Sequence, residues 1–193
     1  MLRRCAVALS IYRRREEKLP KYIANLREKI TETARRQLLS GGYSSMTIRS
    51  ISEECGIAVG TVYNYFKSKD DIIATFMLAD WLRITADMKT AVDAAKNAGE
   101  AVDAVNDGLT QFISIYSNLP EDEKARASFG AAGRHWHFKL RSQLTAILRP
   151  CCKKWAKCYT DEFEDFVAAE ILAMTTENKY QKHRLHLMEH FKE

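Results

Sequence analysis

Residues 47–73 read TIRSISEECGIAVGTVYNYFKSKDDII, and this stretch decides the fold. Thr47 offers a hydroxyl that can cap a short helix over residues 48–54, because an N-cap oxygen accepts hydrogen bonds from the free amides of the first turn. Gly56 then allows a tight turn, and a second short helix follows over residues 59–66. The stretch therefore predicts two short helices joined by a glycine turn.

The second short helix has two different faces. Its spacing puts Val59, Val62 and Phe66 on the inward face, at positions i, i+3 and i+7. The outward positions combine small, polar and aromatic residues: Gly60, Tyr63, Asn64 and Lys67. Exposed side chains that can form hydrogen bonds or apolar contacts on a short helix are what reading the DNA major groove requires.

Two longer helices flank this stretch. Apolar residues recur at helical spacing at Ile23, Leu26, Ile30, Ala34 and Leu38, which predicts an amphipathic helix from Lys21 that ends at Gly41-Gly42. Ser68 followed by Asp71 is typical of a capping box, and it predicts a long helix over residues 69–95.

The rest of the chain is also predicted to be helical, because no segment shows the alternation of polar and apolar residues that is typical of a strand. Further helices are expected over residues 99–118, 121–130, 134–149, 151–175 and 177–192, with Pro120 and Pro150 at boundaries. The sequence thus predicts an all-α fold in three parts. These are a basic N-terminal extension (1–20), a three-helix helix-turn-helix DNA-binding domain (21–68) and a larger helical domain (69–193), to which only the family resemblance given below assigns ligand binding and dimerisation.

Charge separates the two ends of the chain. Residues 1–69 carry 14 basic and 6 acidic side chains, a net charge of +8, while residues 70–193 have a net charge of −3. A basic end suits a module that neutralises phosphates, although a solvated basic face explains the charge equally well. The Arg-rich extension has two readings as well: an arm along the DNA, or a segment without a role in binding.

The stretch from Thr47 to Ile73 closely resembles the tetracycline-repressor (TetR) family of bacterial regulators, and the resemblance spans about residues 30–76. It rests on Gly42, Gly60-Thr61-Val62-Tyr63, Tyr65-Phe66 and Ser68-Lys69. The resemblance implies a homodimer whose recognition helices enter successive major grooves of a near-palindromic operator. It also implies a small-molecule inducer that shifts the helix over residues 69–95 and releases the double-stranded DNA, so that the protein acts as a repressor.

The resemblance assigns DNA contacts residue by residue. Expected contacts to phosphates, bases and backbone come from Thr47, Arg49, Gly60, Thr61, Tyr63, Asn64, Tyr65 and Lys69, with Thr47 and Lys69 on phosphates. The chain has Ala58 where the family often has Ser or Thr, so one cap hydroxyl is missing. The alternative for Tyr63 and Tyr65 is packing beneath the helix, and for Lys69 it is a solvated lysine.

Two side-chain clusters suggest other chemistry. His183, His186 and His190 share one face of a terminal helix, but no cysteine or carboxylate in register completes a metal site, so no metal and no cofactor are expected. The thiols of Cys151, Cys152 and Cys158 have basic neighbours, which leaves open a redox role beside the commoner one of small buried residues.

A ligand pocket and a dimer interface are expected in the C-terminal part, but the sequence does not show which residues would contact a ligand. An aromatic or amphipathic organic inducer would suit the segment Arg134–Phe138 together with Trp81, Phe112, Tyr116, Phe129 and Trp155, although these residues serve equally well as core. Dimerisation is expected through residues 161–192, whose apolar residues are Phe163, Phe166, Val167, Ile171, Leu172, Leu185 and Met188.

Other classes of protein find little support. The chain has no nucleophile elbow, no phosphate-binding glycine loop and no His-Glu-x-x-His motif, so we do not expect an enzyme. It has no apolar run of membrane-spanning length and no secretory leader, so we expect it in the cytoplasm. The alternative to a DNA-binding regulator is a protein of the same fold that acts through protein partners without specific DNA binding.

Overall fold

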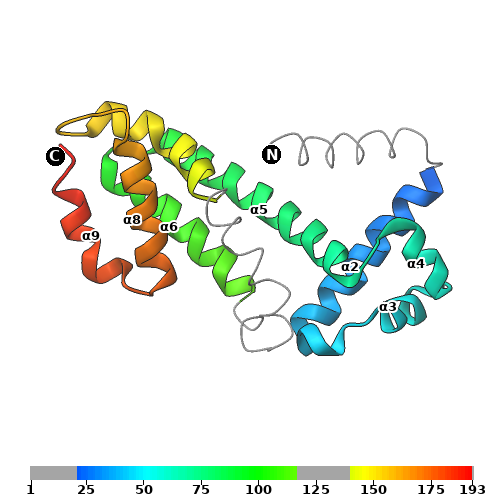
Figure 1. Ribbon diagram of the computed structural model, residues 1–193. Coiled ribbons are helices and arrows are strands. Elements are labelled where there is room, and N and C mark those ends of the chain that lie inside the picture. Colours follow the sequence, from blue (N-terminus) through cyan, green and yellow to red (C-terminus); the bar gives the residue numbers. More distant parts are fainter. Residues whose placement is uncertain (1–20, 117–139, 193) are drawn as a thin grey trace. The chain divides into compact units, whose positions relative to one another are not determined.

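The structure is a computed structural model that describes residues 21–116 and 140–192 (Figure 1). Its helices are α2 (Lys21–Ser45), α3 (Ile48–Cys55), α4 (Val59–Tyr65), α5 (Lys69–Ala94), α6 (Ala98–Ile115), helical residues 140–155, α8 (Phe163–Thr176) and α9 (Tyr180–Met188). Within these ranges the only extended pairing is an isolated antiparallel bridge between Ala156 and Phe191. The predicted all-α fold is confirmed.

Some predictions fall outside the described residues. They are the extension (1–20), the helix over 121–130, the first part of the helix over 134–149 and the aromatic segment Arg134–Phe138 with Phe129. No described helix is long and apolar enough to cross a membrane.

The chain divides into two compact units between Phe76 and Met77, whereas the sequence analysis placed the domain boundary at residues 68/69. Helix α5 starts in the first unit and continues into the second. Its first turns bury Ile72, Ile73 and Phe76, none of which belongs to the core cluster of the second unit. The start of α5 is therefore part of the core of the first unit.

The first unit is built around α2, which contacts α3, and α3 in turn contacts α4. Ile30, Ala34 and Leu38 of α2 are buried as their spacing predicts. The helix breaks at Gly42, whose φ of 77° is a conformation that glycine adopts readily and other residues rarely do. The predicted end at Gly41-Gly42 is thus confirmed as a break, after which one more turn runs to Ser45.

The second unit packs α6 against α8 and α9. Its core includes Trp81 of α5, whose indole Nε1 donates to Gln143 Oε1 at 2.6 Å and whose ring meets Phe112 edge-on at 5.1 Å. The buried amide of Asn106 in α6 accepts a hydrogen bond from Thr175 of α8 at 2.9 Å. At Gly108 a β-carbon would overlap the Met88 side chain, so glycine lets α5 and α6 approach closely here.

Pro150 does not end a helix, contrary to the sequence analysis. Residues 140–155 are helical throughout, and the non-helical segment lies at 156–162 instead, so no single helix covers 151–175. A proline inside a helix costs about 3 kcal/mol. Burial of Leu148, Cys151 and Cys152 on one face offsets that cost, because the apolar face continues across the proline.

Ionic contacts join several helices of the second unit. Arg184 of α9 binds Asp103 of α6 through two hydrogen bonds of 2.5 and 2.7 Å, and Tyr180 donates to the same carboxylate at 2.8 Å. Arg149 donates to Glu164 of α8 at 2.8 Å, and the Glu164 side chain is only 4% exposed. These pairs fix the helices to one another at polar points around the apolar core.

Candidate nucleic-acid interface

Helix α3 and the turn after it have the predicted caps. The amide of Ser50 donates to Thr47 Oγ1 at 3.0 Å, and the amide of Thr47 donates back to Ser50 Oγ at 3.0 Å. At the other end Gly56 has φ 70° and ψ 35°, the left-handed conformation that closes a helix. Thr47 and Gly56 therefore define where α3 starts and where the chain turns toward α4.

Helix α4 presents most of its surface to solvent. Val62 is its one buried residue, and Phe66, directly after the helix, is 1% exposed. Gly60, Tyr63 and Asn64 are exposed, with Tyr63 at 54%. The outward face is confirmed, and packing of Tyr63 beneath the helix is ruled out in this structure.

Three details of α4 refine the sequence analysis. Val59 is 40% exposed, so its predicted inward position is wrong; it is the first residue of the helix, and its neighbours Ala58 and Gly60 are exposed too. Ala58 makes no side-chain cap, as expected from the missing hydroxyl. Thr61 and Tyr65 are half-buried at the sides of the exposed face.

Lys69, the expected phosphate contact, is bound within the unit. Its ammonium nitrogen lies 3.6 Å from the centroid of the Tyr43 ring and donates to the Tyr43 carbonyl. The Tyr43 hydroxyl donates to Asp70 at 2.7 Å. Lys69 is half-buried, so the simple alternative of a freely solvated lysine does not describe it.

Arg49 is at the surface of α3, where its side chain is 84% exposed. Its Nε donates to Glu53 Oε1 at 2.9 Å, one turn further along the same helix, and this hydrogen bond raises the pKa of Arg49. Thr47 is exposed as well. The first unit thus carries all eight expected contact residues, on α3, on α4 and at the start of α5.

Sequence reasoning missed the part that α2 plays in this unit. Lys29 Nζ donates to the carbonyl of Cys55, and Arg27 Nη1 donates to the carbonyl of Tyr65, each at 3.0 Å. Gln37 bridges α2 and α3 by donating to Glu54 at 2.6 Å and accepting from Ser50 at 2.8 Å. The only signal in the sequence was a series of polar residues on the solvent side of an amphipathic helix.

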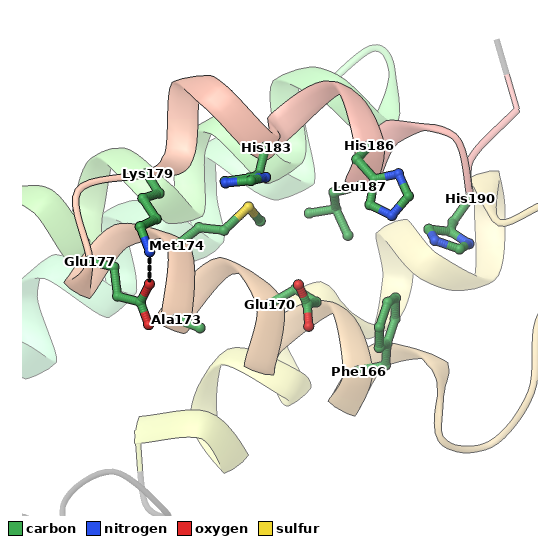
Figure 2. A pocket seen from close by; sticks show the side chains of 10 residues that line it. All are labelled: Phe166, Glu170, Ala173, Met174, Glu177, Lys179, His183, His186, Leu187 and His190. Atoms are coloured by element: carbon green, nitrogen blue, oxygen red, sulfur yellow. Dashed lines mark hydrogen bonds and ion pairs between the residues drawn. The ribbon is translucent and has the colours of Figure 1, made fainter.

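The histidine face lies in the second unit, beside a groove of about 250 Å³ between α8 and α9. Figure 2 shows His183, His186 and His190 on the α9 side of the groove and Phe166 and Glu170 on the α8 side. Among the described residues no group of three or more histidine, cysteine or acidic side chains is placed to hold a metal ion.

The cysteines divide by burial. Cys55, Cys151 and Cys152 are buried free thiols, and Cys158 is exposed. A hydrogen bond from Cys152 lowers the pKa of Cys151 and raises that of Cys152. Burial of the pair, at 2% and 0% exposure, agrees with their use as small core residues.

A short capped helix, a glycine turn and a second short helix with an exposed polar and aromatic face define a helix-turn-helix protein. Residues 30–75 match the family model described as bacterial regulatory proteins, tetR family. The match covers the helix-turn-helix part of the chain, from α2 to the start of α5.

Sequence relatives match about a third of the chain. The HTH-type transcriptional regulator Mb1846 of Mycobacterium bovis is 35% identical over 69 residues, which cover 36% of this chain and 28% of the relative. The fatty acid metabolism regulator protein of Bacillus subtilis is 34% identical over 58 residues, which cover 30% of this chain and 27% of the relative. The matches thus span less than a third of the length of these curated relatives.

Similarity over the whole chain is found at the level of structure. A TetR transcription regulator from Haloarcula marismortui has a TM-score of 0.59 at 20% identity, over 86% of this chain and 90% of that one. At this identity the likeness shows the fold alone. It covers far more of the chain than the 36% that the first of these sequence relatives matches.

Proposed function

We propose that the chain is a transcriptional repressor that binds a near-palindromic DNA operator as a homodimer and is released by a small organic inducer. The observation that carries the proposal is the face of α4, where Tyr63 is 54% exposed beside exposed Gly60 and Asn64. An aromatic side chain that is more than half exposed, next to an exposed amide, suits contact with base edges and thymine methyl groups.

Around α4 lie residues suited to phosphates. The hydroxyls of Thr47 and Thr61, the phenol of Tyr65 and the cations of Arg49 and Lys69 would position the unit on the DNA backbone. Lys69 has to leave the Tyr43 carbonyl to reach a phosphate, and a charge-assisted bond to phosphate is strong enough to replace a bond to a neutral carbonyl. The net charge of +8 over residues 1–69 supports the same partner.

The second unit supports a dimer through α8 and α9, on a smaller set of residues than the sequence suggested. Val167, Ile171 and Leu172 are buried in the core of the unit itself. Phe166 remains 41% exposed and Leu185 75% exposed, and exposed apolar side chains on neighbouring helices suit a second copy of the chain.

An inducer would act through α5, which gives buried side chains to both units. Of the aromatic residues considered for a pocket, Trp81 is 1% exposed and meets Phe112 edge-on, and Phe112 in turn contacts the tilted ring of Tyr116. These rings fill core, so the residues that would contact an inducer stay unassigned. A regulator released from DNA by a metabolite acts in the cytoplasm.

The experiment that tests DNA recognition is a selection from random duplex oligonucleotides with the full chain. We expect an inverted repeat to be enriched, and Tyr63→Ala to lose most of the affinity for it with little change in thermal unfolding, because the side chain is exposed. Tyr63→Phe, which keeps the ring, separates the contribution of the hydroxyl. If the wild-type chain enriches no sequence, the chain acts through protein partners instead.

Dimerisation is tested by sedimentation of two matched leucine variants. Leu185 lies on α9 and Leu82 on α5, and both are exposed, at 75% and 53%. We expect Leu185→Glu to shift the chain to monomer and Leu82→Glu to leave the dimer intact, because only the first places a charge on the proposed interface. A wild-type chain that sediments as a monomer at micromolar concentration refutes the dimer.

A further inference from the structure

At the end of each short helix of the helix-turn-helix, a cationic side chain from α2 donates a hydrogen bond to the carbonyl of the last residue. Lys29 reaches the carbonyl of Cys55, the last residue of α3, and Arg27 reaches the carbonyl of Tyr65, the last residue of α4. Carbonyls at a helix C-terminus lack partners within the helix and carry the negative end of its dipole. A cation there satisfies the carbonyl and stabilises the last turn.

Arg27 makes a second contact that Lys29 does not match. Its guanidinium carbon lies 4.3 Å from the centroid of the Phe66 ring, and Phe66 is 1% exposed. Phe66 is the residue at which the chain leaves α4, with φ −137° and ψ 133°. A planar guanidinium can donate to a carbonyl and stack on a ring at the same time, whereas an ammonium group has no plane to stack.

The two helices depend on these contacts to different degrees. Helix α3 is capped by its own residues at both ends, through Thr47 and Gly56. Helix α4 has seven residues, no side-chain cap at Ala58 and a single buried residue. A helix this short is not stable by itself in water, so its orientation has to come from contacts with the rest of the unit. At its C-terminal end those contacts include Phe66 and Arg27.

We propose that Arg27 is a positioning residue for DNA recognition, which fixes the direction of α4 relative to α2 and thereby the aim of Tyr63 and Asn64. This inference rests on the proposed function, because it concerns how the same unit reads DNA. Arg27 acts through the Tyr65 carbonyl and the Phe66 ring, and contact with the DNA itself is not part of its role.

The test uses full-length chains carrying Arg27→Gln, Arg27→Lys or Lys29→Gln. Lys29→Gln is the matched control, since it removes the same charge and the same kind of bond from the same helix. The probes are the duplex enriched by the wild-type chain and a shuffled duplex of equal length and composition. Affinity for both is measured over a range of salt concentrations, together with amide exchange in α4.

We expect Arg27→Gln to lower the ratio of specific to shuffled affinity about tenfold and to speed amide exchange at the end of α4. The slope of log affinity against log salt stays unchanged, because no phosphate contact is lost. Arg27→Lys recovers part of the ratio, as an ammonium keeps the carbonyl bond without the stacking. Lys29→Gln keeps the ratio within about twofold, because α3 has its own caps.

Two results overturn the inference. If Arg27→Gln weakens binding to both duplexes equally and lowers the salt slope by about one, Arg27 is a phosphate contact. If it lowers the melting temperature and leaves the ratio unchanged, its role is general stability. Failure of the proposed function is recognised separately, because the wild-type chain then enriches no sequence, and the inference falls with it.

Discussion

Arg141 and Arg149 lie about two turns apart on helical residues 140–155, and each binds a carboxylate in the first turn of α8. Arg149 binds Glu164, whose side chain is 4% exposed, and Arg141 binds Asp165, whose side chain is 41% exposed. The two arginines therefore form a matched pair that differs in the burial of the acid. We expect Arg149→Met to destabilise the chain and Arg141→Met to have a small effect.

The size of the effect follows from burial. A buried charge that loses its partner costs about 3–5 kcal/mol. Because the Arg149 side chain is itself 54% exposed, water can reach its place, and we expect a loss of about 2–3 kcal/mol in the free energy of unfolding. In a chain of this length that lowers the melting temperature by roughly 4–12 °C. An exposed pair such as Arg141 with Asp165 contributes about 0.2–1 kcal/mol.

The free energy of unfolding that Arg149→Met loses is expected to depend on pH. Burial alone would raise the pKa of Glu164, but the Arg149 guanidinium and the Tyr159 hydroxyl beside it outweigh burial and hold the pKa below its ordinary value. The stabilisation is therefore present above the unfolded pKa of about 4.3 and is lost as the pH falls through the folded pKa. In Arg149→Met the guanidinium no longer lowers this pKa, so the difference in stability between the two chains shrinks as the pH falls through the folded pKa of the wild type.

Urea unfolding followed by circular dichroism at pH 7 and pH 3 measures these free energies. The gap between wild type and Arg149→Met should be large at pH 7 and smaller at pH 3. Equal losses for the two arginine variants, or a gap that does not change with pH, would refute the reasoning.

Three further perturbations test other parts of the fold. Gly56→Ala should cost about 1–2 kcal/mol by urea unfolding, because φ 70° is unfavourable for a residue with a β-carbon. Gly108→Ala should destabilise the chain in melting experiments, and less so in a Met88→Ala background, because the added methyl overlaps the Met88 side chain. Burial alone would raise the pKa of Asp103, but hydrogen bonds from Arg184 and Tyr180 outweigh burial and lower this pKa. The stabilisation that these hydrogen bonds provide is therefore lost as the pH falls below about 4. Unfolding of Arg184→Gln should therefore depend less on pH in that range than unfolding of the wild type.

Local signals in the sequence predicted the helix-turn-helix well. The caps at Thr47 and Ser68 and the turn at Gly56 each depend on residues within a few positions, and all three are present. At Ser68 the predicted capping box with Asp71 is formed in part. The Asp71 amide donates to the Ser68 hydroxyl, but the Asp71 carboxylate accepts from the amide of Lys67, one residue before the cap.

Predictions that required knowledge of packing were less successful. Pro150 is a strong local signal for a helix end, yet the burial of Cys151 and Cys152 keeps the helix intact. The spacing of Val59 with Phe66 assumed one helix through both, whereas Phe66 lies after its end in extended backbone.

Long-range contacts had no signal at all. Arg184 meets Asp103 across 81 positions of sequence, and Lys69 meets Tyr43 across 26. The same holds for Arg27, which meets Tyr65 across 38. Partners at such separations are chosen by the folded arrangement of helices, which spacing rules do not describe.

Helix α4 has only one buried side chain, Val62, among its seven residues. Under the proposed function, folding of the unit and the choice of DNA sequence therefore depend on largely separate positions. Gly60, Tyr63 and Asn64 can change over evolutionary time, or in a designed library, without passing through unfolded variants. Under the proposed function, a new DNA target is reached by a few single substitutions on α4 that leave the second unit unchanged.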